Sequence, residues 1–145
     1  MKRKTKPVSK RKTPKRKAVD VNPIANVAAV MPAIRPQYRI QKWTQPNTPN
    51  PAMLRNILAQ EGYSVCQWSD RPGTELGMHK HGSQQSHWVV SGTLEINVQG
   101  RGANILGPGD RDFMPDDTYY SVRVIGEDAV LYLIGELHVT DRKPT

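Results

Sequence analysis

The second half of the chain consists of short alternating runs of apolar and polar residues, and this pattern limits its fold more than any other feature. From Tyr63 onward the runs are separated by residues such as Gly, Pro and Asp, which favour tight turns. We expect strands over residues 63–69, 74–81, 85–91, 93–98, 102–106, 111–114, 119–125 and 129–136. No helical pattern separates these runs, so a parallel βαβ arrangement is excluded, and an antiparallel barrel or sandwich is predicted.

One helix is predicted ahead of the strands, over residues 50–62. Asn50 suits the N-cap, Pro51 suits the first helical position, and Gly62 suits the end of the helix. The helix would carry one narrow apolar stripe, formed by Met53, Leu54, Ile57 and Leu58. We expect this stripe to close one end of the barrel.

The basic character of the chain belongs to its first residues. Residues 1–17 contain ten of the 21 Lys and Arg and no acidic residue, which leaves 11 basic and 13 acidic residues in the rest of the chain. With so few apolar side chains, residues 1–20 are predicted to be a disordered basic tail, followed by a proline-rich linker over 21–49 and a barrel domain over 50–140. The tail suits a tether to nucleic acid or to an anionic surface. A solvated extension with no dedicated partner explains it equally well.

Two features point to the cytoplasm. The apolar run at residues 24–34 is interrupted by Pro32 and is shorter than the roughly 20 residues of a transmembrane helix, so no transmembrane segment is expected. The single cysteine, Cys66, excludes an internal disulfide and agrees with a reducing compartment. Because Cys66 lies in an alternating run, we expect a small packed side chain rather than a nucleophile.

Three of the four histidines lie close together, between His79 and His87. Side chains two apart on a strand share a face, so His79 and His81 are predicted to project together, and Gln85 to project with His87. Trp88 is predicted on the opposite face. Two imidazoles at this spacing can reach one metal ion at about 2.1 Å, and a buried structural pair is the alternative.

Two motifs carry a resemblance to a known family. The first consists of His79, His81, Gln85 and Gly92, and the second runs from Pro108-Gly109-Asp110 through Pro115 to Tyr120. In spacing they resemble the two motifs of the cupin superfamily, over residues 63–136. The resemblance implies an all-β fold with a single antiparallel, jelly-roll-type barrel. In chemistry the chain departs from the family twice, because the family's metal-binding Glu falls on Gln85 and its second-motif His falls on Tyr120.

The resemblance and the residues together give a candidate site. The predicted metal ligands are His79, His81, Gln85, His87 and Tyr120, for a divalent ion such as Zn, Fe, Mn or Ni. Tyr120 and Glu75, which shares strand parity with His79, are the candidate proton-transfer residues. One function class is a metal-dependent protein that binds or converts a small molecule. The other is a binding or sensing barrel without turnover. A homodimer is also predicted, because a small barrel leaves sheet edges exposed.

Overall fold

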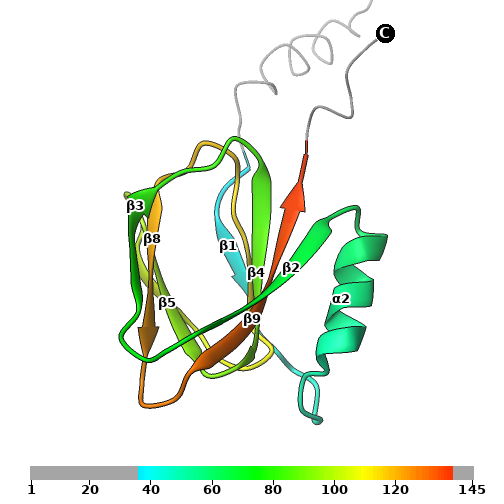
Figure 1. The fold of residues 1–145 in the computed structure, drawn as a ribbon. Coiled ribbons are helices and arrows are strands. Elements are labelled where there is room, and N and C mark those ends of the chain that lie inside the picture. Colours follow the sequence, from blue (N-terminus) through cyan, green and yellow to red (C-terminus); the bar gives the residue numbers. More distant parts are fainter. Residues whose placement is uncertain (1–35, 139–145) are drawn as a thin grey trace, which may run out of the picture. The chain divides into compact units, whose positions relative to one another are not determined.

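The computed structural model describes residues 36–138, which form a barrel of two antiparallel sheets with one helix (Figure 1). The elements in chain order are β1 (Arg39–Gln41), α2 (Pro51–Gln60), β2 (Ser64–Asp70), β3 (Glu75–His79), β4 (Gln84–Ser91), β5 (Thr93–Val98), β6 (Gly102–Leu106), β7 (Arg111–Phe113), β8 (Tyr120–Ile125) and β9 (Val130–Leu137). Each strand predicted from the sequence is present within two residues of its expected ends. The predictions for the basic tail and for residues 21–35 lie outside the described residues.

The strands form two sheets whose order differs from their order in the chain. The first sheet has the order β1-β7-β4-β9-β2, and the second has the order β3-β8-β5-β6. All pairs are antiparallel. Because β2 and β3 are consecutive in the chain but lie at the edges of different sheets, the barrel is open between them.

The core lies between the two sheets, and the strands contribute to it unequally. Its buried apolar residues come mainly from β4, β5, β8 and β9, and include Val89, Leu94, Ile96, Val98, Leu106, Val124 and Val130. The hairpin from β4 to β5 turns at Gly92, where φ is +82° and an added Cβ would lie 2.5 Å from the carbonyl oxygen of Ala129. Only glycine fits both conditions. The last glycine of the first motif is therefore explained by backbone packing.

The helix lies outside the barrel and not at its end. Asn50 caps it by accepting hydrogen bonds from the amides of Ala52, at 2.9 Å, and Met53, at 3.2 Å. Of the predicted stripe only Leu54 and Leu58 are fully buried, which contributes about 2 kcal/mol each. They pack with three side chains on the outer face of the five-stranded sheet, Trp88, Val90 and Leu133. The prediction that the helix closes one end of the barrel was wrong, because its buried leucines pack on the outward-facing residues of β4 and β9. Figure 1 shows the helix beside the barrel, next to β2.

The segment before the helix is partly built into the first sheet. Within the predicted linker, β1 pairs with β7 in register Ile40 to Asp112. Trp43 packs on Gly109, whose φ of +88° and contact with the indole leave no room for a side chain. The described residues contain no helix that is long and apolar enough to cross a membrane. The homodimer and the cytoplasmic location stay predictions.

Candidate functional site

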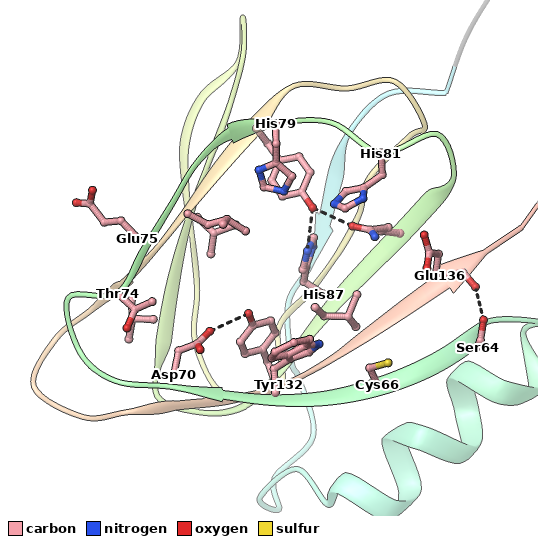
Figure 2. Close-up of a pocket in the computed structure, with 17 residues that line it drawn as sticks. Ser64, Cys66, Asp70, Thr74, Glu75, His79, His81, His87, Tyr132 and Glu136 are labelled. Atoms are coloured by element: carbon pink, nitrogen blue, oxygen red, sulfur yellow. Dashed lines mark hydrogen bonds between the residues drawn. The ribbon is translucent and has the colours of Figure 1, made fainter.

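A cavity of about 540 Å³ lies between the two sheets (Figure 2). It is lined by side chains of β2, β3, β4, β8 and β9, namely Ser64, Cys66, Trp68, Asp70, Thr74, Glu75, Leu76, His79, His81, Gln85, His87, Tyr120, Val122, Val124, Tyr132, Ile134 and Glu136. The volume is in the range that holds a small organic ligand. The cavity therefore contains every residue of the predicted site.

Five of these residues meet at one end of the cavity, and we call them the polar cluster: His79, His81, Gln85, His87 and Tyr120. The Tyr120 hydroxyl donates a hydrogen bond to Gln85 Oε1 at 2.8 Å and lies 3.5 Å from His87 Nε2. The ring centroids of His79 and His81 are 5.0 Å apart, and that of His79 is 4.4 Å from that of Tyr120. Figure 2 shows the three imidazoles at this end. The strand parity predicted for them is confirmed, because Trp88 lies on the other side of the sheet.

His87 is fixed from behind by a buried carboxylate. Its Nδ1 lies 3.1 Å from both oxygens of Asp112, and its backbone amide donates to Asp112 Oδ1 at 2.7 Å. Tyr38 donates to the other oxygen at 3.0 Å. A carboxylate accepts hydrogen bonds, so Nδ1 carries a proton, and in the neutral imidazole the lone pair is on Nε2, which faces the cavity. Asp112 is completely buried, and it therefore sets which face of the imidazole a ligand meets.

His79 presents a lone pair for a similar reason. Its Nδ1 is 2.7 Å from the carbonyl oxygen of Gly77, which can only accept, so the neutral ring has a bare Nε2. Burial lowers the pKa of His81, and so does the neighbouring imidazole of His79, since two protonated rings would repel each other. A lowered pKa favours the neutral form of His81 near pH 7. Neutral imidazoles that present lone pairs accept hydrogen bonds or bind cations.

Tyr120 is held as a neutral phenol. Its side chain is buried, and this burial, together with the charge of Asp112, raises its pKa. The hydroxyl therefore keeps its proton and directs it to Gln85. The raised pKa opposes proton loss, so the environment supports Tyr120 as a hydrogen-bond donor and makes proton transfer from it harder.

Gln85 is the least satisfied polar side chain of the polar cluster. It is only 6% exposed, and its Oε1 accepts from Tyr120. Its amide nitrogen has no hydrogen-bond partner within residues 36–138. A buried N–H donor without a partner costs about 1–3 kcal/mol. A ligand that offers an acceptor at this point would recover that cost.

The other end of the cavity is open and largely apolar. Val122, Val124 and Ile134 form its inner wall, and Trp68, which is 51% exposed, stands at its edge. Cys66 also faces this space and is exposed. The prediction that Cys66 is packed was wrong, because β2 is an edge strand whose inward face borders the opening.

Glu75 is not brought to the polar cluster. Its side chain is 66% exposed, 3.9 Å from Arg123, and Figure 2 shows its carboxylate directed away from the three histidines. The pairing of β3 with β8 shifts register between Leu76 and His79. Parity left the cavity rim and the surface equally possible for Glu75, and the structure has it lining the cavity with an exposed carboxylate.

Sequence reasoning missed two carboxylates, Asp112 and Glu136. Glu136 is the Cα partner of Gln85 across β4 and β9, and its side chain lines the cavity. Both residues reach the site through pairing between distant strands. The only local signal was parity, because Glu136 alternates with Ile134 and Tyr132 on the inward face of the last predicted strand.

The polar cluster fits a divalent metal in atom type but not in arrangement. Imidazole nitrogens suit such ions, and His79 and His87 both present them. Within the described part of the chain, however, no group of three or more His, Cys, Asp or Glu is placed to hold an ion. The oxygen of Gln85 is engaged by Tyr120, whose raised pKa disfavours the phenolate that metals prefer. As arranged here, the imidazoles make an incomplete metal site.

Comparisons with known proteins agree with the fold. No protein-family model and no curated protein matches the chain. A cupin 2 domain-containing protein from Halorhodospira halophila is similar with a TM-score of 0.52 and 16% identity, over 70% of this chain and 77% of that one. A cupin-like protein from Thermotoga maritima is similar with a TM-score of 0.50 and 20% identity, over 54% of this chain and 59% of that one. The described residues thus have the cupin fold, as the two motifs predicted.

Proposed function

We propose that the cavity binds a small organic molecule and that the polar cluster recognises its polar group. The observation that carries this proposal is the buried amide nitrogen of Gln85, which lines the cavity and has no partner among the described residues. Natural proteins rarely leave such donors unpaired. A ligand acceptor at this position completes the hydrogen bonds of the polar cluster.

Recognition would use donors and acceptors in a fixed order. Gln85 donates to the ligand, while the Nε2 atoms of His79 and His87 accept from it. Tyr120 holds the amide of Gln85 in this orientation through the 2.8 Å bond to Oε1. Asp112 does the same for His87 through Nδ1. The apolar wall then buries the carbon skeleton of the ligand, at about 25 cal/mol for each Å² removed from water.

Binding without turnover is the reading that these contacts favour. A general base is missing from the pair of predicted proton-transfer residues, because Tyr120 keeps its proton and Glu75 faces solvent. In an enzyme, Tyr120 would act as the acid and the Nε2 of His87 as the base, 3.5 Å apart. Turnover of a bound compound would decide for that alternative.

The proposal is tested by screening small molecules for thermal stabilisation of the full chain and of Gln85→Leu. We expect ligands that stabilise the natural protein and lose at least about tenfold in affinity in Gln85→Leu. Gln99→Leu is the matched control, because Gln99 is an exposed glutamine at the end of β5. Equal affinity of the two variants would place the ligand elsewhere.

A divalent ion on the histidine pair is the second candidate function. It is favoured by the bare Nε2 of His79 and by the lowered pKa of His81. Metal analysis of purified protein is expected to show an ion that is lost in His79→Ala/His81→Ala and kept in His138→Ala, a histidine whose side chain is 54% exposed. If this candidate is right, Gln85→Glu raises the affinity, since a carboxylate attracts a dication more strongly than an amide. Equally poor metal retention in the natural protein and the double variant would reject it.

A further inference from the structure

The charges on the cavity wall are of one sign. The lining residues include three carboxylates, Asp70, Glu75 and Glu136, and no Lys or Arg belongs to this part of the described barrel. A cavity with low-dielectric walls strengthens the field of the charges that line it. The wall therefore attracts positive charge and repels negative charge.

Glu136 carries most of this argument, because it stands beside the polar cluster. It lies opposite Gln85 in the pairing of β4 with β9, and its Oε2 accepts from the Ser83 hydroxyl at 2.6 Å. Its other oxygen is 3.8 Å from His138, and no Lys or Arg pairs with it within residues 36–138. The carboxylate is thus oriented by a neutral donor and pairs with no Lys or Arg of the described residues.

Asp70 repeats the arrangement on β2. It accepts from the Tyr132 hydroxyl at 3.1 Å, and no basic side chain of the described region forms an ion pair with it. Glu75 differs, because Arg123 lies 3.9 Å from it outside the cavity. Two of the three carboxylates are therefore available to a ligand.

Aromatic side chains line the cavity farther along the same strands. Trp68 and Tyr132 are paired across β2 and β9, and Tyr132 lies four residues from Glu136 on β9. Trp68 is about half open to solvent. Aromatic rings offer apolar surface to a ligand and also attract a cation. An amine held beside Glu136 can therefore extend its apolar body along the strand toward these rings.

From these contacts we infer that the ligand of this cavity is an organic cation, a protonated amine with an apolar body, and that Glu136 is its main counter-charge. The inference rests on the proposed function and adds the charge class of the ligand. Gln85 and the imidazoles read a neutral hydrogen-bonding group of the same molecule. Organic anions of the same shape are rejected by Glu136 and Asp70.

The test uses matched probes that differ only in charge. Benzylamine, benzyl alcohol and benzoate, with their cyclohexyl counterparts, are titrated into the full chain by calorimetry in the presence of a chelator. We expect the amines to bind about tenfold more tightly than the carboxylates, with the alcohols between them. Glu136→Gln is expected to lower the affinity for amines about fivefold and to leave that for alcohols unchanged. Glu127→Gln removes one exposed acid from the turn after β8 and serves as the control.

The outcomes separate this inference from the proposal beneath it. Carboxylates that bind as tightly as amines, or amines that bind Glu136→Gln as well as the natural protein, overturn the charge class and leave the binding function standing. Absence of binding by every probe, charged or neutral, contradicts both.

Discussion

Two clusters of polar side chains in the barrel differ in how many of their hydrogen-bond donors and acceptors have partners in the chain. In the first, which we call the Asp110 cluster, Asp110 accepts from Lys42 Nζ at 2.9 Å and from the amides of Trp43, at 2.8 Å, and Gly107, at 2.9 Å. Every partner belongs to the chain. The Asp110 cluster ties the segment before the helix to the loop before β7, and it offers nothing to a ligand.

The polar cluster has the opposite character. Tyr120 and Gln85 bind each other, but the amide nitrogen of Gln85 and the Nε2 of His79 have no hydrogen-bond partner within the described residues. Unused donors and acceptors cost stability, so their presence in a cavity indicates a use other than holding the fold. The comparison indicates that the share of hydrogen-bond donors and acceptors with partners in the chain, more than the residue types, distinguishes a structural polar cluster from a binding site.

Asp112 has partners in the chain, as Asp110 does, and it also holds His87 of the polar cluster. Its loss is expected to have the largest effect on the free energy of unfolding. Asp112→Ala removes the acceptor of the Tyr38 hydroxyl and of both N–H groups of His87. Because these donors would stay buried without a partner, we expect a loss of about 3–4 kcal/mol in the free energy of unfolding, measured by urea denaturation.

Tyr38→Phe is the matched control for this prediction. It removes one donor to Asp112 and leaves the bonds to His87 in place, so a loss of about 1 kcal/mol is expected. Equal losses in the two variants would show that the bond from Tyr38 accounts for the whole effect of Asp112 and that the bonds to His87 add no stability.

Asp110→Asn is expected to cost about 2 kcal/mol at pH 7, because an amide cannot accept from three donors and loses the charge facing Lys42. Burial would raise the pKa of Asp110, but the hydrogen bonds from Lys42, Trp43 and Gly107 hold it below its usual value. The folded pKa is thus lower than the unfolded one. The contribution is complete above the unfolded pKa of about 4 and is lost as pH falls through the folded pKa.

The pH dependence provides the check. Denaturation between pH 7 and pH 2 should show a shallower loss of stability in Asp110→Asn than in the natural protein, so the two curves approach each other in acid. Parallel curves would mean that the carboxylate is not held in its ionised form by these bonds.

The parts of this comparison that the sequence predicted are the local ones. Alternation along one strand correctly placed Gln85 and His87 inside the barrel and Trp88 outside it, because side-chain parity needs no knowledge of the partner strand. The turn glycines and the helix cap followed from local backbone chemistry in the same way. The fold followed from these elements and from the spacing of the two motifs.

The parts that were missed depend on pairing between distant strands. Glu136 meets Gln85 only through the register of β4 with β9, and Tyr38 meets Asp112 across 74 positions of the chain. For Glu75, parity left the cavity rim and the surface equally possible, and the shift of β3 against β8 is not visible in an alternation pattern. Whether every donor and acceptor of a polar cluster has a partner depends on all of these long-range contacts. The sequence could therefore identify the candidate residues, but it could not distinguish the Asp110 cluster from the polar cluster.

Gln85→Leu is expected to change the free energy of unfolding by less than about 1 kcal/mol. Any change is expected to be an increase in stability. Leucine removes the unpartnered amide N–H from a side chain that is 6% exposed, while the Tyr120 hydroxyl loses its acceptor and retains His87 at 3.5 Å. Urea denaturation without added ligand measures this. A loss above about 2 kcal/mol would show that Gln85 belongs to the fold in the same way as Asp110.

The smallest effect on the free energy of unfolding is expected for His79→Ala. His87→Ala serves as the comparison. Among residues 36–138, the His79 ring forms a hydrogen bond only to Gly77, two residues away on its own strand, so its loss should cost less than about 0.5 kcal/mol, the range of surface substitutions. His87 is 2% exposed and bound to Asp112, and its loss removes the imidazole donor to that buried carboxylate and leaves a cavity in its place, which should cost about 2–3 kcal/mol. Thermal denaturation of both variants measures the difference between two histidines that share one cavity. Similar losses would mean that the imidazoles of His79 and His87 form a single structural unit, and the assignment of His79 to ligand binding would then fail.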